Sequence, residues 1–401
     1  MPQYGIVIVG GGEAGVRAAF RLRELGYDGG IALLSDEHAF PYERPPLSKS
    51  DGAVRLIVPE SAYAEARIAL YRGCTVFSID PARKEVETSS GTFSYDRLLL
   101  APGAAPRRLA AVEGGHYLRT DRDAVAILAG ITPGSHLVVI GAGFIGLEVA
   151  ATARARGARV TVLEQAPRIL GRSVVAEIAQ ALHDRHVGEG VRIETGATCT
   201  PSSREVRLAS GERLDADVVL IGIGSVPRTK LAEEAGLQVD NGILVDGHFR
   251  SSAPDIFAAG DCCSFRLNGR VVRFESWRVA RDQAEQAAAS MLDRAAEPQA
   301  LPYFWSDQYD LCLQVVGIPD PQRVGVSRVM ENGALLVFQL DEGGRLAAVS
   351  GLGAGTSLSR EIKIAERLIA QGARPDPDRL RDPAVSLKKL LSEKQEAPAG
   401  A

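Results

Sequence analysis

The sequence predicts an α/β protein with two Rossmann-like dinucleotide-binding domains and a third, α+β domain at the C-terminus. Three observations lead to this fold class. A strand, glycine turn, helix and strand follow one another twice, first from Tyr4 and again from Ser135. The pattern changes after Leu301 to β-rich stretches followed by a helix. With 401 residues, the chain is also too long for a single compact core.

Each copy carries a G-x-G-x-x-G turn between an apolar strand and an amphipathic helix. The first glycine permits the tight bend, the second lets the backbone approach a pyrophosphate, and the third allows close helix–strand packing. The helix N-terminus adds free N–H groups and a positive dipole. One such motif is weak evidence, but two in the same context predict two dinucleotide sites. The six glycines are Gly10, Gly12 and Gly15 in the first copy and Gly141, Gly143 and Gly146 in the second.

The remaining segments complete the domains. Residues 70–100 and 191–224 are expected to form hairpins that return to the parallel sheets. Beyond Leu301, a sheet and then a helix from Ser359 to Gln371 indicate a separate module. The polar, small residues from Ser392 to the end are expected to be disordered.

Composition and charge exclude several classes of function. A net charge of −4 gives no overall attraction for nucleic acid or an anionic membrane, and no apolar run is long enough to span a bilayer. The first strand starts almost at the N-terminus without a secretion signal, so we expect a cytoplasmic protein. No metal site is expected, because metal-ligand spacing is absent among the five cysteines, Cys74, Cys199, Cys262, Cys263 and Cys312.

The segment PYERPPLSK, from Pro41 to Lys49, contains no cysteine, although disulfide-reducing flavoenzymes carry a redox-active cysteine pair after the first βαβ unit. Together with YLRT, DIFAAGD and FWSDQYD, it resembles the FAD-dependent ferredoxin reductases of bacterial oxygenase systems, of the putidaredoxin reductase and biphenyl dioxygenase reductase type. The resemblance covers nearly the whole chain and implies a glutathione reductase-like fold. Residues 1–107 and 236–300 would then bind FAD, residues 108–235 would bind NAD(H), and residues 301–401 would form the C-terminal domain.

For FAD, the resemblance implies contacts beyond the first glycine turn. They are Ala14 under the pyrophosphate, Asp36 on the adenosine ribose, Val76 at the adenine, Arg44 and Lys49 along the cofactor, Arg119 and Trp277 beside the flavin, and Asp261 on the ribityl chain. A fixed Lys49 ammonium near the ring could stabilise the negative charge of the reduced flavin; a solvated side chain on a proline-rich loop is the alternative. Asp261 ends the DIFAAGD strand, and a following helix is expected to point its N-terminus at the flavin.

Two departures weaken this part of the pattern. Ser35 stands at the strand end where the second unit has a glutamate, so ribose recognition passes to the next residue, Asp36. The family's ATG is APG here, Ala101 to Gly103, which removes a hydroxyl.

The second unit is expected to bind NADH. Glu164 ends its second strand, where a carboxylate bonds the ribose 2′-OH and repels a 2′-phosphate. Arg168 and Arg172 nearby could tolerate a phosphate, although surface charge is the more common role of such arginines. The resemblance places Glu148 near the nicotinamide; a glutamate that merely stabilises the helix dipole is as good an interpretation. Gly222 and Gly224 are expected to let the nicotinamide ring and its ribose approach the backbone; a simple strand-end turn is the alternative.

Trp277 and Trp305 are the only tryptophans of the chain. The resemblance places Trp305 at the mouth of the flavin site, toward the protein partner, and implies roles in electron transfer for both tryptophans, Lys49 and Glu148. The pair Cys262–Cys263 is interpreted as structural, because a vicinal disulfide is strained.

The resemblance implies an NADH-dependent ferredoxin reductase. A hydride passes from NADH to FAD, and single electrons then pass to a [2Fe-2S] ferredoxin that serves an oxygenase. The open alternatives are a reductase of rubredoxin or of a small molecule such as monodehydroascorbate, and a non-enzymatic FAD/NADH sensor like apoptosis-inducing factor. An arginine-rich run from Arg266 to Arg281 is a candidate docking surface for the ferredoxin.

Overall fold

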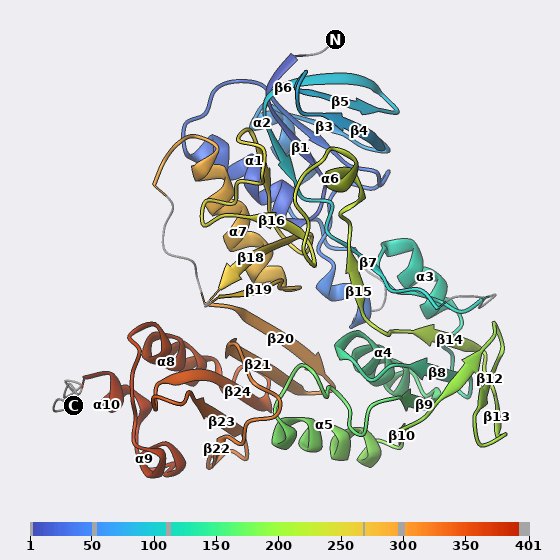
Figure 1. Ribbon diagram of the computed structural model, residues 1–401. Helices are drawn as coiled ribbons and strands as arrows, with labels where there is room; N and C mark the ends of the chain where they lie inside the picture. Colours follow the sequence, from blue (N-terminus) through green and yellow to red (C-terminus); the bar gives the residue numbers. More distant parts are fainter. Residues whose placement is uncertain (1–2, 50–53, 110–113, 268, 296–300, 393–401) are drawn as a thin grey trace. The chain divides into compact units, whose positions relative to one another are not determined.

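The computed structural model describes residues 3–49, 54–109, 114–267, 269–295 and 301–392 (Figure 1). The chain divides into two compact units. Unit 1 contains residues 1–46, 53–105 and 225–300, and unit 2 contains residues 47–52, 106–224 and 301–401. Two short strands at the unit boundaries, β7 (Ala104–Pro106) and β15 (Ser225–Pro227), pair with each other.

Unit 1 is built on a seven-stranded sheet in the order β3-β2-β1-β6-β5-β4, with β17 on β6. The strands are β1 (Gln3–Val9), β2 (Ile31–Leu34), β3 (Ile68–Tyr71), β4 (Val76–Asp80), β5 (Glu85–Thr88), β6 (Gly91–Leu100) and β17 (Ile256–Ala258). All but β4 and β5 are parallel. Val9 pairs with both Leu34 and Leu100, and Leu100 also pairs with Ala258, so four parallel strands end at one edge of the sheet. In α/β sheets, ligands bind at this edge.

The helices α1 (Glu13–Glu24) and α7 (Trp277–Ser290) pack against each other in unit 1 (Figure 1). Small side chains on α1, including Ala14, Ala18 and Ala19, are buried and allow this close packing. The other elements here are η1 (Pro45–Ser48), α2 (Glu60–Glu65), α6 (Lys230–Glu234) and a small sheet of β16 (Ile243–Val245), β18 (Cys263–Leu267) and β19 (Arg270–Val272).

The nucleotide-type part of unit 2 has a parallel sheet in the order β10-β9-β8-β14. Its strands are β8 (His136–Ile140), β9 (Arg159–Glu164), β10 (Arg192–Thr195) and β14 (Val218–Ile221), and its helices are α3 (Asp121–Ala129), α4 (Phe144–Ala155) and α5 (Ala176–Gly188). An antiparallel sheet of β11 (Cys199–Pro201), β12 (Glu205–Leu208) and β13 (Arg213–Asp215) is inserted before β14. Thr120 caps α3 through a reciprocal pair of hydrogen bonds with Asp123.

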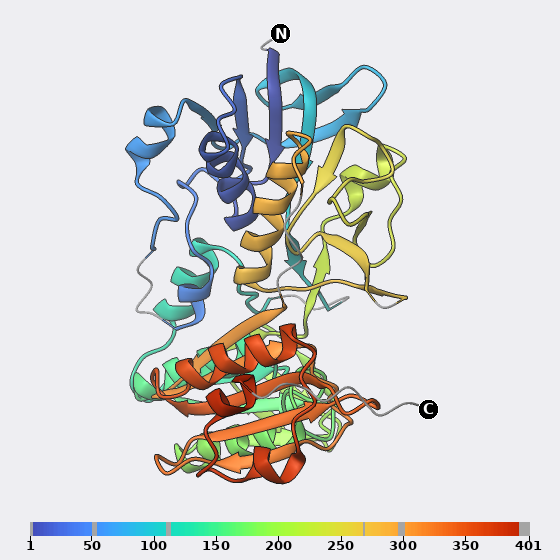
Figure 2. The ribbon, with the colours of Figure 1, turned by 90° about the vertical axis from the view of Figure 1, so that its left-hand side faces the viewer.

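The C-terminal part of unit 2 is an antiparallel sheet in the order β20-β21-β24-β23-β22. The strands are β20 (Tyr303–Gln308), β21 (Leu311–Gly317), β22 (Val326–Val329), β23 (Leu335–Leu340) and β24 (Leu346–Ala354). Helix α8 (Ser359–Ala370) packs on β21 and β24 (Figure 2), and α9 (Pro377–Arg381) and α10 (Leu387–Ser392) follow. The buried Arg328 of β22 donates to backbone carbonyls of Arg379, Leu380 and Val385, which anchors these last helices.

The predicted fold class is confirmed: both βαβ units and the C-terminal sheet-plus-helix module are present. One local expectation was wrong. Arg192–Thr195, expected in a hairpin, instead extends the parallel sheet as β10 beside β9. The predicted disordered end, beyond Ser392, lies outside the described residues. Among the residues that the structure describes, every helix is too short or too polar to cross a lipid bilayer.

Candidate functional site

In the glycine turn of unit 1, Gly10 and Gly15 lie against neighbouring backbone atoms, whereas Gly12 faces open space. Gly10 has φ +117°, and a Cβ there would lie 2.1 Å from the carbonyl oxygen of Ala101. A Cβ at Gly15 would lie 1.9 Å from the carbonyl oxygen of Gly10. A Cβ at Gly12 would meet nothing within 4 Å. The first and third glycines are therefore required by the fold, whereas the second lines open space.

The same geometry occurs at the second turn. A Cβ at Gly141 would lie 2.4 Å from the Gly222 carbonyl oxygen, and one at Gly146 would lie 2.5 Å from the Gly141 carbonyl oxygen. At Gly143 the nearest atom, again the Gly222 oxygen, is 3.9 Å away. The N-caps of α1 and α4 are Gly12 and Gly143, and neither N-terminus has a side-chain cap. Open space in front of free helix amides fits the pyrophosphate of a dinucleotide in both units.

The motifs expected around FAD meet at the first turn. A Cβ at Gly260 would lie 3.1 Å from Cβ of Ala14, so the DIFAAGD segment contacts the start of α1. The next residue, Asp261, is one of the acidic groups that raise the pKa of the Arg44 guanidinium, against the opposing effect of burial. The chain after Asp261 enters β18, and the next helix, α7, begins only at Trp277. The following helix expected after Asp261 is therefore α7, and the β18–β19 hairpin separates the two.

Two acidic residues after β2, Asp36 and Glu37, form different contacts. Asp36 is exposed and pairs with Arg228 at 3.0 Å. Its neighbour Glu37 accepts hydrogen bonds of 2.6 Å from Tyr42 Oη and Arg44 Nη2. Arg44 is thus held by Glu37, a residue that sequence reasoning missed. Val76 begins β4, where it pairs with Thr88.

Glu13, at the first position of α1, is a further residue that sequence reasoning missed. Burial raises the pKa of its carboxyl to about 7, although the Arg281 guanidinium and the nearby Trp277 side chain oppose the rise. Trp277, expected beside the flavin, therefore lies next to the first turn of α1. The only signal in the sequence is an acid at the positive end of a helix.

Glutamine at position 13 is expected to stabilise the FAD-free protein at pH 8 by about 1–2 kcal/mol and to have little effect at pH 5. Because the carboxyl pKa is raised from 4.5 to about 7, the folded protein binds more protons than the unfolded chain in that window. Ionisation of Glu13 therefore lowers stability as the pH rises, and glutamine cannot ionise. Thermal unfolding at both pH values measures the difference, with Glu60→Gln on an exposed helix start as the control. An equal change in unfolding temperature for Glu13→Gln at pH 5 and pH 8 would show that Glu13 does not titrate in this window.

In the second unit, Glu164 supports the glycine turn directly. Its Oε2 accepts a 2.7 Å hydrogen bond from the Ala142 amide, and its Oε1 accepts a 2.8 Å bond from the Ala166 amide. The carboxylate that was expected to read the ribose thus also fixes the turn between Gly141 and Gly143. Each carboxylate oxygen keeps a further lone pair for a ribose hydroxyl.

The two arginines near Glu164 differ. Arg168 Nη2 donates to the carbonyls of Gly171, Val174 and Pro321, so Arg168 holds the local backbone. Arg172 is exposed, and its Nη2 lies 4.0 Å from the position of a Cβ at Gly224, which has φ +106°. Arg172 therefore lies beside the Gly224 turn, and of the two arginines it is the one whose side chain is exposed.

A cluster of polar side chains lies on the buried face of α4. Glu148 Oε1 lies 3.3 Å from Lys49 Nζ and accepts a 2.5 Å hydrogen bond from Ser306 Oγ. Glu148 Oε2 accepts a hydrogen bond from Ser48 Oγ. Lys49 Nζ also lies 3.6 Å from Asp307 and 5.6 Å from the ring centre of Trp305. Three of the four predicted catalytic residues, Lys49, Glu148 and Trp305, are therefore neighbours.

Burial raises the pKa of Glu148, while Lys49 and the two serine hydroxyls lower it. A glutamate that only stabilised a helix dipole would face water; this one has 6% of its surface exposed. The segment that carries Lys49 is tied to α4 by Thr152 Oγ1, which donates to the Ser48 carbonyl at 2.9 Å. Arg119, expected on the flavin side, lies in unit 2 just before the cap of α3.

The thiols of Cys262 and Cys263 are free and fully buried. Burial raises the pKa of Cys262 to about 12 and raises that of Cys263 well above its ordinary value. Thiols with such pKa values are not nucleophilic at neutral pH. Among the described residues, no three His, Cys, Asp or Glu side chains are grouped so that they could hold a metal ion.

The expected arginine-rich surface is smaller than the sequence indicated. Arg273 donates to the Asp261 carbonyl and pairs with Glu275 at 2.6 Å. Arg278 and Arg281 lie 3.8 and 3.5 Å from acids one turn further along α7. Arg266 and Arg270, on the β18–β19 hairpin, remain exposed.

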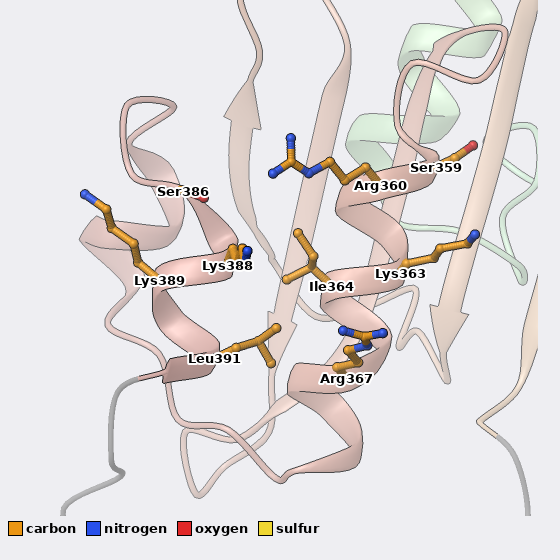
Figure 3. Close-up of a pocket in the computed structure, with 9 residues that line it drawn as sticks. All are labelled: Ser359, Arg360, Lys363, Ile364, Arg367, Ser386, Lys388, Lys389 and Leu391. Carbon is orange, nitrogen blue, oxygen red and sulfur yellow. The ribbon is translucent and has the colours of Figure 1, made fainter.

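A second basic surface lies between α8 and α10, around a hollow of about 940 Å³ (Figure 3). Ile364 and Leu391 form its apolar wall. Five exposed basic residues surround it, namely Arg360, Lys363, Arg367, Lys388 and Lys389. We call this surface the C-terminal basic groove.

Two family models match the chain. The model of the pyridine nucleotide-disulphide oxidoreductases matches residues 4–284, and the reductase C-terminal model matches residues 303–391. Among curated proteins, the chain is 41% identical to the ferredoxin–NAD(+) reductase component of the anthranilate 1,2-dioxygenase system of Burkholderia cepacia, over 96% of this chain and 98% of that protein. It is 40% identical to a rubredoxin–NAD(+) reductase of Pseudomonas putida, over 78% and 86% of the two chains.

A solved structure agrees with these matches. The chain is similar to putidaredoxin reductase in its covalent complex with putidaredoxin, with a TM-score of 0.91 and 35% identity over 98% of each chain.

Proposed function

Because the chain belongs to the pyridine nucleotide-disulphide oxidoreductase family and carries the reductase C-terminal domain, we propose that it is an FAD-dependent NADH:ferredoxin oxidoreductase whose electrons reach an oxygenase through a [2Fe-2S] ferredoxin. One observation carries this proposal. In a chain with two open glycine cradles, the segment that follows the first βαβ unit carries Lys49, paired with Glu148 of α4, where disulfide reductases use cysteines.

FAD is assigned to unit 1. Gly12 and the free amides of α1 hold its pyrophosphate, with Ala14 beneath it and Asp36, Arg44, Val76 and Asp261 along its length. Bound FAD supplies the chemistry that links a two-electron donor to a one-electron acceptor. The protein supplies position and charge.

NADH is assigned to the Gly143 cradle of unit 2. Glu164 orients the ribose, Gly222 and Gly224 let the ring approach the backbone, and Arg172 lies at the edge of the site. Glu148 is a buried acceptor beside the start of α4, and the Lys49 ammonium is held by Glu148, Asp307 and the face of Trp305. We propose that this ammonium faces the flavin and that Arg119 and Trp277 flank the flavin. The proposed domains follow the sequence assignment, except that residues 47–52 pack with unit 2 and residues 225–235 with unit 1.

The preferred acceptor is a [2Fe-2S] ferredoxin. The relative from B. cepacia is named for a ferredoxin, and a similarly close relative is named for rubredoxin. Anaerobic reduction by NADH of a panel containing a [2Fe-2S] ferredoxin, a rubredoxin and monodehydroascorbate tests the assignment. We expect the ferredoxin to have the highest kcat/KM. Faster turnover with rubredoxin or with monodehydroascorbate would make that acceptor the preferred one. Slow turnover with all three would favour a non-enzymatic sensor.

The C-terminal basic groove is the proposed docking surface, because ferredoxins are commonly acidic and the whole chain has a net charge of −4. A local positive surface is then needed to attract the partner. No direct role for nucleic acid or a membrane is proposed, and the five free cysteines support a cytoplasmic location.

NADH is expected to have a kcat/KM at least tenfold above that of NADPH, because the Glu164 carboxylate repels a 2′-phosphate. Glu164→Gln keeps the size of the side chain but removes the charge and one of the two acceptors of the backbone amides. It should raise kcat/KM for NADPH relative to that for NADH by about tenfold. Steady-state ferricyanide reduction measures both cofactors. Glu194→Gln on the neighbouring strand β10 is the control. Equal use of both cofactors by the unmodified protein would contradict the prediction, and loss of NADPH activity in Arg172→Ser would then identify the residue that overrides Glu164.

A further inference from the structure

A chain of buried hydrogen bonds leads to the Glu148 carboxylate from the turn between β20 and β21. Tyr309 Oη lies 2.9 Å from His186 Nδ1, and His186 Nε2 lies 2.8 Å from Gln308 Oε1. Gln308 Nε2 donates to Ser306 Oγ at 3.1 Å, and Ser306 Oγ donates to Glu148 Oε1 at 2.5 Å. This hydrogen-bond network therefore connects α5, the β20–β21 turn and α4 within unit 2.

In this hydrogen-bond network, the donors and acceptors follow one consistent order from Tyr309 to Glu148. An ionised Glu148 beside the Lys49 ammonium can only accept, so Ser306 must donate its single proton to it. The Ser306 oxygen then accepts from the amide nitrogen of Gln308. The Gln308 oxygen in turn accepts from His186 Nε2–H, which leaves His186 Nδ1 to accept from the Tyr309 hydroxyl. Each proton in the chain points toward Glu148.

Because the network is buried, reversing or removing any of its hydrogen bonds costs free energy. His186 has 0% of its surface exposed, and Gln308 and Ser306 have 1% each. An unpaired polar atom at such positions cannot be satisfied by bulk water. Burial also lowers the pKa of His186, against a smaller effect of Gln308, so the ring stays neutral.

We propose that Gln308 and His186 are positioning residues that fix the Ser306 hydroxyl as a donor and so keep Glu148 ionised and correctly oriented. This inference rests on the proposed role of Glu148 beside the nicotinamide. Neither residue touches the cofactor; both act through Ser306.

Among the described residues, the following charged and polar groups face the two ends of the network. Glu148 faces Lys49 and Ser48 from the preceding segment and Ser306 from β20, while Asp307 is the second partner of Lys49. At the other end, Arg185 lies beside the Tyr309 ring and pairs with Glu189 and Asp310. His183 and Arg185 lower the pKa of His186 slightly.

The first test is the tautomer of His186 in the full-length, FAD-loaded protein. Nitrogen-15 NMR of the imidazole rings is practical because the chain has only six histidines, and His186→Gln identifies the resonance. We expect a neutral Nε2–H ring that does not titrate between about pH 6 and pH 8. A ring protonated at Nδ1, or one that titrates normally, would overturn the proposal.

The second test is the protonation of Glu148, observed as the infrared carboxyl band that Glu148→Gln abolishes. Gln308→Leu should raise the pH at which this band appears by about 0.5–1 pH unit, and Ser306→Ala by about 1–2 pH units. Ser306→Thr, which keeps the hydroxyl, should restore the original value. The control is Gln339→Leu, a buried glutamine of β23 whose hydrogen bonds go to Asp320 and Arg323 instead. An unchanged Glu148 band in folded Gln308→Leu protein would overturn the proposal.

These readouts separate the inference from the proposed function. If Glu148→Gln left flavin reduction by NADH unchanged, the role of Glu148 in the reaction would fail. The histidine tautomer and the carboxyl band would still decide whether Gln308 and His186 position it.

Discussion

Glu148→Gln is expected to slow the reduction of bound FAD by NADH by about 10- to 100-fold, because a hydrogen bond to a charged group contributes about 1.5–3 kcal/mol. The carboxylate accepts from Ser48, Ser306 and Lys49. A glutamine of the same shape offers one acceptor and two donors, so at least one of these buried donors loses its partner. The Lys49 ammonium then turns toward Asp307, its other acidic neighbour.

Anaerobic rapid mixing with NADH, followed by the loss of flavin absorbance, measures this step without any ferredoxin. Glu331→Gln, on the exposed turn between β22 and β23, is the matched control. Lys49→Met should give a loss of similar size, and the double variant should lose little more than either single one, because the pair acts as a unit. Full-speed flavin reduction in Glu148→Gln, or additive losses in the double variant, would remove the pair from the mechanism.

Lys388→Glu combined with Lys389→Glu is expected to lower kcat/KM for an acidic ferredoxin by about tenfold or more at low salt. The reason is loss of electrostatic attraction at the C-terminal basic groove, which sets the association rate. In the unmodified protein, ferredoxin-dependent cytochrome c reduction should fall as salt rises, because the attraction is screened beyond about 10 Å at 0.1 M ionic strength. Ferricyanide reduction by NADH, which needs no docking, should change much less.

Arg266→Glu combined with Arg270→Glu is the matched comparison on the β18–β19 hairpin. These two arginines are exposed, whereas Arg273 is held by the Asp261 carbonyl and Glu275 and would confuse the result by disturbing the fold. If the hairpin variant, rather than the groove variant, abolished the salt dependence, the docking surface would be assigned to the hairpin. If neither did, docking would not depend on either surface.

The glycine turns could be predicted from the sequence because their constraints are local. The tight contacts at Gly10 and Gly15 arise within a single strand–turn–helix unit, and the repeat of the motif placed a second unit in the same way. Arg192–Thr195 was misassigned because β10 is a partly exposed edge strand, and its polarity resembles that of a hairpin strand.

The polar network around Glu148 could not be predicted, because it joins residues far apart in the sequence. Ser48 and Ser306 lie 100 and 158 positions from Glu148. Both stand in the motifs PPLSK and FWSDQYD, but nothing in those motifs indicates that the two serines bind the same carboxylate. Arg273 was assigned to a docking surface for the same reason: its binding to the Asp261 carbonyl depends on the return of the β18–β19 hairpin. Nor could the sequence indicate that Glu37, rather than Asp36, forms the ion pair with Arg44.

The segment that carries Leu47, Ser48 and Lys49 is covalently part of the first βαβ region but packs with unit 2. Unit 2 is thus assembled from three separate stretches of chain, and the shortest of them supplies two of the groups that satisfy Glu148. Exchange of nucleotide domains between relatives at residues 105 and 225 would separate Glu148 from its own Ser48 and Lys49. Functional chimaeras of this family must therefore transfer the PPLSK segment together with residues 106–224, the proposed NADH-binding part. Recombination that ignores the segment would leave a buried carboxylate with mismatched donors.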